Sequence, residues 1–219
     1  LKPVFIDSDP YTWNMNVEEL ENKITKKTKA ILVCHIYGLP TPMNRIIKLA
    51  KKYKLKIIED AAEAHGLIYN NKYCGSFGDI SIFSFYANKL ITTGEGGMLL
   101  TDNYFLADKM KNLRNLYFGK YDRFIHNEIG WNYRMTNIQA ALGCAQLEKW
   151  NSNIIKKKQI GSYYQQLIHK NDNIQLPLEE AYNSKNIYWV FGIILKGKFK
   201  NKAKKFINIL KHYKIDSRP

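Results

Sequence analysis

Residues 84–97 read SFYANKLITTGEGG, and the rest of the chain can be understood as holding this stretch in place. It carries one lysine, Lys89, with Ser84 five residues before it and a glycine-rich turn after it. Upstream, the apolar segment 57–60 (IIED) ends in an acidic residue, Asp60. A carboxylate at a strand end and a lone lysine in a polar loop bounded by glycines are the groups that an aldehyde cofactor with a basic ring nitrogen requires.

Short apolar runs alternate with amphipathic segments, a pattern that is typical of α/β folds. Strands joined by helices through short links predict a parallel sheet built of βαβ units. Ligands of such sheets bind beyond the carboxyl ends of the strands, which places His35, Asp60 and Ser84 at the working edge. We expect strands at residues 30–34, 55–58, 80–85 and 97–100, with a helix that opens at Pro42 between the first two.

Two capping boxes predict helices elsewhere in the chain. The one at Asn16 begins a short helix, and the one at Thr136 begins a long helix that runs to about His169 and breaks near Gly161. The other predicted elements are a strand at residues 2–7, a helix capped by Asp102 that runs to about residue 117, a strand at 188–195 and a helix at 203–212.

The chain of 219 residues carries 34 basic and 19 acidic side chains, a net charge of +15. Nucleic-acid binding is one reading of this charge, but the lysines are scattered over predicted helix faces and turns and form no single stripe. Lysines on solvated helix faces explain the net positive charge better. A polyanionic small substrate such as a nucleotide diphosphate is also compatible with this charge. No apolar run approaches the ~18 residues of a membrane span. The three cysteines, odd in number and widely spaced, favour a reducing cytosol over a disulfide framework.

Each residue of the central constellation has an ordinary structural reading beside the chemical one. Asp60 could cap the next turn through the amides of Ala62 and Glu63, or it could pair with a protonated ring nitrogen. Ser84 could be a strand serine or a phosphate donor. A partly desolvated Lys89 can form a Schiff base with an aldehyde. The glycines after Lys89 match neither a P-loop nor a dinucleotide fingerprint, and a tight turn is the modest reading.

Four ordered motifs extend this constellation along the chain: EDAAEAHG at 59–66, GSFGD at 75–79, the run 83–97, and GWNYRMTNIQAA at 130–141. Together they resemble the DegT/DnrJ/EryC1/StrS family of pyridoxal 5'-phosphate-dependent sugar aminotransferases. The resemblance implies an α/β protein of fold type I (aspartate aminotransferase-like), with a mixed, mostly parallel sheet between helices and a small α+β C-terminal domain. We expect residues 1–150 to form the large cofactor-binding domain, and residues 151–219 to form a long linking helix and the start of the small domain. We also expect the sequence to be a fragment that lacks material at both ends.

The resemblance also implies roles for individual residues in binding the cofactor. Lys89 would form the Schiff base with the cofactor and shuttle the proton to the sugar. Asp60 would pair with the pyridine nitrogen, and Glu63 would lie near the ring hydroxyl. Ser84 would bind the phosphate, and Asn132 would reach the phosphate of the neighbouring subunit's cofactor, so that a homodimer shares its active sites.

A second group of residues is expected at the sugar nucleotide. His126, Tyr133 and Arg134 lie in the loop that family members place near the partner's site, and Arg218 resembles a family arginine near the substrate. The chemical roles of His35, His65 and Glu95 stay open at this stage.

Within the family, residues 9–14 (DPYTWN) and 85–89 (FYANK) look most like 4-aminotransferases of the perosamine-synthase type. This likeness predicts a cytoplasmic enzyme that moves an amino group, with glutamate as the expected donor, to C4 of a nucleotide-linked 4-keto-6-deoxy sugar. A sugar 3-dehydratase of the same family is the alternative, although those enzymes carry a histidine where Lys89 stands. A basic nucleic-acid-binding protein is the alternative from another class. The sequence leaves the nucleotide base and the sugar stereochemistry open.

Overall fold

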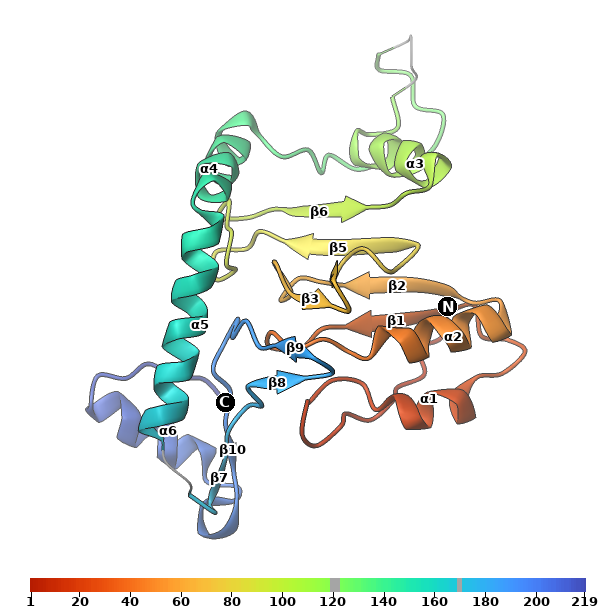
Figure 1. Cartoon of the computed structure of the whole chain (residues 1–219). Helices are drawn as coiled ribbons and strands as arrows, with labels where there is room; N and C mark the ends of the chain where they lie inside the picture. Colours follow the sequence, from red (N-terminus) through yellow and green to blue (C-terminus); the bar gives the residue numbers. More distant parts are fainter. Residues whose placement is uncertain (119–122, 169–170) are drawn as a thin grey trace.

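The computed structural model describes residues 1–118, 123–168 and 171–219, and its centre is a four-stranded sheet (Figure 1). The strand order is β1 (Ala30–Cys34), β2 (Lys56–Asp60), β5 (Ile80–Ser84) and β6 (Gly97–Leu100). The first three strands run parallel, and β6 pairs with β5 in the antiparallel sense. The predicted mixed, mostly parallel sheet is therefore confirmed.

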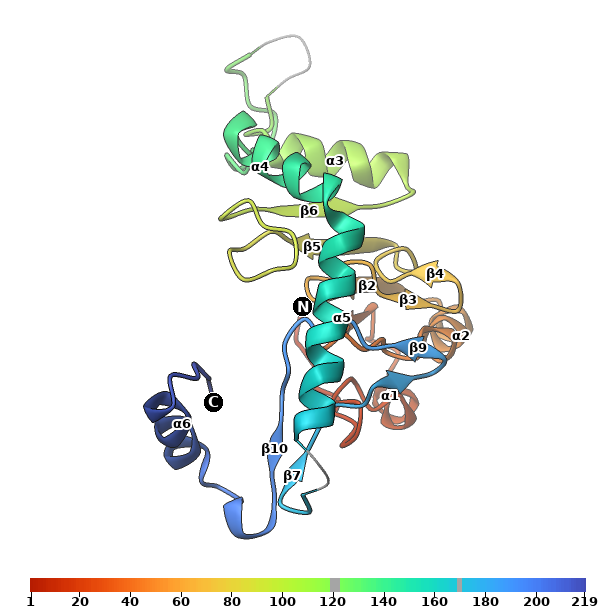
Figure 2. The same ribbon diagram turned by 60° about the vertical axis from the view of Figure 1, so that its left-hand side comes forward.

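Two helices, α1 (Val17–Lys23) and α2 (Met43–Tyr53), lie together on one face of this sheet (Figures 1 and 2). Asn16 accepts a hydrogen bond from the Glu18 amide and begins α1 as predicted. Side chains from α2 and from β1 fill the space between helix and sheet, among them Met43, Ile46 and Val33, all without solvent exposure. Burying these apolar side chains is the main favourable term in holding the layers together.

The remaining helices lie around the sheet. They are α3 (Tyr104–Arg114), α4 (Asn137–Glu148), α5 (Trp150–Leu167), the 3-10 helix η1 (Gly197–Phe199) and α6 (Ala203–His212). The helix α6 has its predicted bounds, and α4 begins with the predicted capping box at Thr136. The arrowheads of β1, β2 and β5 point toward α5, which passes the carboxyl edge of the sheet (Figure 1). None of the helices in the described ranges is both long and apolar enough to cross a bilayer.

Three antiparallel two-stranded ribbons complete the secondary structure of the described residues. Their strands are β3 (Ile68–Tyr69) with β4 (Lys72–Tyr73), β7 (Ile174–Gln175) with β10 (Ile194–Leu195), and β8 (Glu180–Ala181) with β9 (Ser184–Lys185).

The structure corrects two expectations near helix ends. The N-cap of α3 is Asn103, whose side chain accepts from the Leu106 amide, and not Asp102. The long helix divides at Lys149, between α4 and α5, and not at Gly161. Gly161 lies inside α5, and a side chain there would collide with the Tyr188 ring, which lies 2.2 Å from a Cβ built at that position. The predicted end at His169 lies outside the described residues.

Two predicted strands are largely wrong. Residues 2–7 are extended but unpaired among the described residues, and an isolated bridge between Ser8 and Met15 is the nearest pairing. Residues 188–195 form a strand only at Ile194–Leu195. The segment before it packs instead on the loop after β1, where the Ile187 amide donates to the Gly38 carbonyl at 3.1 Å.

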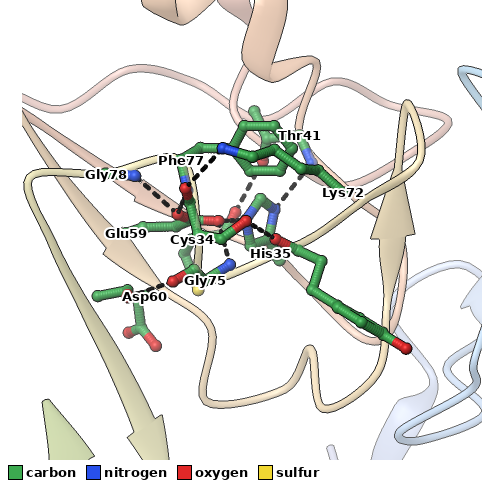
Figure 3. Close-up of polar contacts among 12 residues, drawn as sticks. Cys34, His35, Thr41, Glu59, Asp60, Lys72, Gly75, Phe77 and Gly78 are labelled. Carbon is green, nitrogen blue, oxygen red and sulfur yellow. Dashed lines mark hydrogen bonds and ion pairs between the residues drawn. The ribbon is translucent and has the colours of Figure 1, made fainter. Parts of the chain in front are cut away.

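A buried carboxylate, that of Glu59 in β2, joins β1, β2 and the loop before β5 (Figure 3). Its Oε1 accepts from His35 Nε2 at 2.9 Å and from the Gly75 amide, and its Oε2 accepts from the Phe77 and Gly78 amides at 2.9 and 3.0 Å. Burial alone would raise the pKa of Glu59, but these hydrogen bonds outweigh it and leave the pKa below its ordinary value. The carboxylate is therefore ionised and fully paired in the core.

The carboxylate of Glu59 and the ring nitrogens of His35 are all engaged in hydrogen bonds within the core. Nδ1 of His35 accepts from the Thr41 amide at 3.1 Å, so its Nε2 carries the hydrogen that Glu59 accepts. The thiol of Cys74 lies close to both side chains, but burial raises its pKa strongly and keeps it protonated. With both carboxylate oxygens and both ring nitrogens engaged, the cluster acts as a structural clamp and offers no lone pair for a metal ion.

We predict that Glu59→Gln lowers the free energy of unfolding by about 3 kcal/mol or more, because an amide NH₂ would face backbone donors that lose their acceptor. Urea unfolding followed by circular dichroism measures this change. Glu21→Gln, at an exposed carboxylate that bonds Lys52, is the matched control and should move the midpoint little. Equal midpoints for Glu59→Gln and the wild type would refute the clamp.

Candidate active site

The carboxyl ends of the three parallel strands bring the predicted cofactor residues to one edge of the sheet. Asp60 is the last residue of β2 and Ser84 the last of β5, and the register pairs Cys34 with Asp60 and Asp60 with Ile82. Burial and the nearby acidic side chains of Asp60 and Glu63 raise the pKa of Cys34 to about 12, so its thiol is protonated and inert at this edge.

The Asp60 carboxylate serves the turn with one oxygen and keeps the other one available. Its Oδ1 accepts from the Ala62 amide at 3.0 Å. No further hydrogen bond to this carboxylate is formed within the described parts of the chain. The structural reading of Asp60 as a turn cap is thus correct, and it leaves an acceptor for a ligand at the strand end.

Lys89 is mostly buried, with 11% of its side chain exposed. Its Nζ lies 3.8 Å from Glu63 Oε1 and 3.8 Å from the centroid of the Trp189 ring. A turn holds its backbone, because the Lys89 amide donates to the Tyr86 carbonyl at 2.9 Å. The lone lysine of the central stretch is therefore enclosed at the site edge by an acid and an aromatic ring.

Glu63 is close enough to Lys89 for the charge of the lysine to affect the pKa of the carboxyl group. Its Oε2 accepts from the Tyr37 amide at 2.9 Å. Burial raises the pKa of Glu63, and the negative charge of Asp60 adds to this, while the Tyr37 amide and Lys89 act in the opposite direction without cancelling it. A carboxyl with a raised pKa beside an amine can exchange a proton with ligands bound between them.

His65 is a buried, neutral imidazole near Lys89. It packs against Phe83 and Phe85, with ring centroids 5.3 and 6.0 Å away. Burial, helped by the charge of Lys89, lowers the pKa of His65 to about 4. Its Nε2 has no hydrogen-bond partner within the described ranges. A neutral His65 therefore adds no positive charge beside Lys89.

Ser84 bonds within its own loop, and the turn after Lys89 is fixed by a side chain of α4. The Ser84 hydroxyl accepts from the Tyr86 amide at 3.3 Å, which leaves its hydrogen free to donate. The Thr92 amide and carbonyl both bond the side chain of Gln146 in α4, at 3.0 and 2.8 Å. The carbonyl of Glu95 accepts from the Thr93 hydroxyl, so its backbone holds the turn while its side chain is exposed.

Asn132 and the predicted substrate residues make no hydrogen bond or ion pair with Lys89, Asp60 or Ser84 within the described ranges. Asn132, Tyr133 and Arg134 are exposed in the loop after α3, where Asn132 Oδ1 accepts from Arg134 Nε at 3.4 Å. His126 lies in the same loop, and its Nδ1 is 2.6 Å from the Leu116 carbonyl oxygen. In Figure 1, α3 lies at the opposite end of the sheet from the arrowheads of β1, β2 and β5. Arg218 is exposed near the end of the chain.

Sequence reasoning missed the aromatic side chains around Lys89. The sequence predicts no chemical role for Trp13 or Trp189, yet the Trp189 ring lies on the Lys89 amine. Tyr37 links the two tryptophans, with ring centroids 5.9 Å from Trp13 and 6.1 Å from Trp189. No local pattern could have shown this, because the rings come from distant segments.

The residues present fit an aldehyde cofactor that carries a pyridine ring and a phosphate. Lys89 offers an amine, Asp60 a free carboxylate oxygen, and Ser84 a hydroxyl donor on the same edge. The glycines at 94 and 96 adopt positive φ angles of 79° and 149°, so the backbone can make the tight turn that leads back into β6.

Comparison with known proteins gives a consistent result. A GDP-perosamine synthase of Escherichia coli O157:H7 is 44% identical over 194 residues, which cover 89% of this chain and 52% of that protein. A GDP-perosamine synthase of Caulobacter vibrioides is 39% identical over 217 residues, covering 99% and 58%. Among solved structures, PseC of Helicobacter pylori, an aminotransferase involved in the biosynthesis of pseudoaminic acid, has a TM-score of 0.89 at 32% identity and covers 97% of this chain and 57% of that one.

The chain thus spans little more than half the length of the relatives it matches. Another structure with the same fold is an Escherichia coli sugar dehydratase with bound hydrated pyridoxal phosphate. The predicted α/β fold of this family and, at the level of the family, the predicted pyridoxal phosphate cofactor are confirmed, while the small α+β C-terminal domain stays a prediction. The match to the family extends over residues 1–219. The chain belongs to the DegT/DnrJ/EryC1/StrS aminotransferase family.

Proposed function

We propose that this protein transfers an amino group from an amino acid, with glutamate as the donor, to C4 of a nucleotide-linked 4-keto-6-deoxy sugar for glycan or polysaccharide biosynthesis. The observation that carries the proposal is the nearly buried amine of Lys89 beside Glu63, at the sheet edge where Asp60 keeps one free carboxylate oxygen. The similarity to two GDP-perosamine synthases supports the sugar nucleotide as substrate.

Each residue at the edge has a distinct task in this proposal. Pyridoxal phosphate supplies an electron sink for the carbanion formed at the substrate. Lys89 would hold the cofactor covalently through its Nζ and, once released by the incoming amine, would move the proton at C4 of the sugar. Asp60 keeps the ring nitrogen protonated through its free oxygen, and Ser84 donates to the phosphate. Glu63, with its raised pKa, donates to the ring hydroxyl.

Two other functions remain as alternatives. Solved sugar 3-dehydratases share the fold at 24–25% identity. The family resemblance implies a histidine in dehydratases at the position of Lys89, and the lysine favours amino transfer. A nucleic-acid-binding protein would use the net charge of +15. The enclosed Lys89 with its acidic neighbours favours small-molecule chemistry over a charged docking surface.

A homodimer with shared active sites is part of the proposal. Asn132, His126, Tyr133 and Arg134 form no hydrogen bond or ion pair with Lys89, Asp60 or Ser84 in the described parts of the chain, and a second copy would bring them to a sugar nucleotide or to the cofactor phosphate. Arg218 would contribute to the same substrate site.

We also propose the division into a cofactor domain (1–150) and a linking helix with the start of a small domain (151–219), which agrees with the helix break at Lys149. A cytoplasmic location agrees with the three free cysteines, Cys34, Cys74 and Cys144.

The direct test of function is incubation of the purified protein with pyridoxal phosphate, glutamate and a panel of 4-keto-6-deoxy sugar nucleotides. We expect one 4-amino sugar nucleotide by mass spectrometry, formed together with 2-oxoglutarate, and no turnover above background for Lys89→Ala. Lys26→Ala, at an exposed lysine, is the control and should keep full activity. Free ammonia with a deoxy sugar and no amino sugar would instead identify a dehydratase. Salt-sensitive DNA or RNA binding that survives Lys89→Ala would support the basic binding protein.

Asp60→Asn should lower the rate of amino transfer about 100-fold or more, because an amide cannot hold the ring nitrogen in its charged form. The change should affect kcat far more than the KM for the sugar nucleotide, as steady-state kinetics will show. Asp102→Asn, at an exposed position outside the site, is the matched control. A kcat within threefold of the wild type for Asp60→Asn would exclude its pairing with the cofactor.

Shared active sites predict complementation between two inactive variants. In a heterodimer of Lys89→Ala with Asn132→Ala, one site has both substitutions and the other has none. Random exchange of subunits should therefore restore about a quarter of the wild-type activity. Mixing each variant with itself is the control, and the dimer mass is checked by light scattering. No recovery after proven exchange would place Lys89 and Asn132 in the same subunit's site, or Asn132 outside it.

A further inference from the structure

An indole ring from the second half of the chain lies on the amine of the proposed catalytic lysine. The Trp189 ring centroid is 3.8 Å from Lys89 Nζ, within the range of a strong cation–π contact. The indole is also held by its own hydrogen bond, because its Nε1 donates to the Asn88 carbonyl at 3.1 Å. The Trp189 side chain thus contacts the Lys89 amine and also donates a hydrogen bond to the backbone of Asn88, the residue before the lysine.

The backbone of Trp189 is fixed independently of this contact. Its carbonyl accepts from Nζ of Lys157 in α5 at 2.9 Å, and burial lowers the pKa of that lysine. The preceding amide, that of Tyr188, donates to Asn186 Oδ1 at 2.6 Å. The indole therefore approaches Lys89 from a segment that is anchored on α5.

Gly38 shows how closely this segment packs on the loop after β1. A Cβ at Gly38 would lie 2.7 Å from the Tyr188 amide nitrogen, and the residue has a φ of +103°. Ile187, whose amide donates to the Gly38 carbonyl, is buried. Any side chain at Gly38 would push the segment, and Trp189 with it, away from the site.

The Trp189 ring also packs near Tyr37, with ring centroids 6.1 Å apart, and Tyr37 in turn contacts Trp13. Glu63 lies 3.8 Å from the Lys89 amine and accepts a hydrogen bond from the Tyr37 amide. The amine of Lys89 therefore has both an aromatic face and a carboxyl within 4 Å, and Tyr37 contacts both of these groups.

We propose that Trp189 is a positioning residue for Lys89, which covers the amine, excludes water from it and keeps it beside Glu63 at the carboxyl edge of the sheet. The reason for positioning the amine rests on the proposed function, since covalent attachment of an aldehyde needs Nζ at one place. The contact itself exists without cofactor or substrate. An aromatic face favours the charged form of an amine and shields it, so loss of the ring should make Lys89 more reactive and more mobile.

The test measures the modification of Lys89 in the cofactor-free protein by a limiting amount of an acetylating reagent, with peptide mass spectrometry. Trp189→Leu should raise the acetylation rate of Lys89 about tenfold relative to exposed Lys26. Trp189→Phe keeps an aromatic face and should restore most of the protection. Trp13→Phe, which alters the aromatic wall away from the amine, is the matched control and should change the rate less than twofold.

Lys157 reports in the same experiment whether the segment stays docked, because its bond goes to the Trp189 backbone. A constant Lys157 rate together with a faster Lys89 rate supports positioning. An unchanged Lys89 rate in Trp189→Leu would overturn the proposal, and so would a joint rise of Lys89 and Lys157, which would show a purely structural role. Because no cofactor or substrate takes part, either result is separate from the outcome of the amino-transfer assay.

Discussion

The buried carboxylate of Glu59 is the interaction on which the geometry of this edge depends. An ionised group in the core costs several kcal/mol in lost hydration, and the cost is offset only when nearly every lone pair has a donor. Glu59 has four, one from the His35 ring and three from the loop between β4 and β5. The requirement for these donors fixes the loop, the end of β1 and the end of β2 together. Asp60, the next residue, therefore leaves its strand in a defined direction.

The ionisable side chains of residues 59–65 are neighbours in the chain, but their surroundings shift their pKa values in different directions. Glu59 is surrounded by fixed donors, and its pKa falls. Glu63 lies four residues later. The Tyr37 amide and the Lys89 amine lower its pKa, but burial and the charge of Asp60 raise it more, so the pKa of Glu63 rises. His65 is kept neutral by burial and by Lys89. Groups pushed in opposite directions within one short segment are typical of active sites, where one member is structural and another can exchange protons.

The sequence analysis succeeded where the determining interactions are local. The strands that lead to Asp60 and Ser84, the cap at Asn16 and the capping box at Thr136 all depend on residues within one turn or one strand, and the structure shows each of them, with the strand ends shifted by one or two residues. It failed where a distant partner decides. Residues 2–7 have apolar side chains suited to a strand but no neighbouring strand among the described residues.

Trp189 shows the same limit at the site itself. Residues 188–195 (YWVFGIIL) have the composition of a β-strand. Most of them form no strand, because the segment around Trp189 packs on Gly38 and α5 instead. Gly161 and Gly38 make this docking possible, because a Cβ at either position would strike the backbone or the ring of Tyr188. The environment of Lys89 is consequently built by both proposed domains. The proposed boundary near residue 150 coincides with the break between α4 and α5, but the proposed catalytic lysine has its aromatic neighbour Trp189 only when the segment beyond α5 is in place.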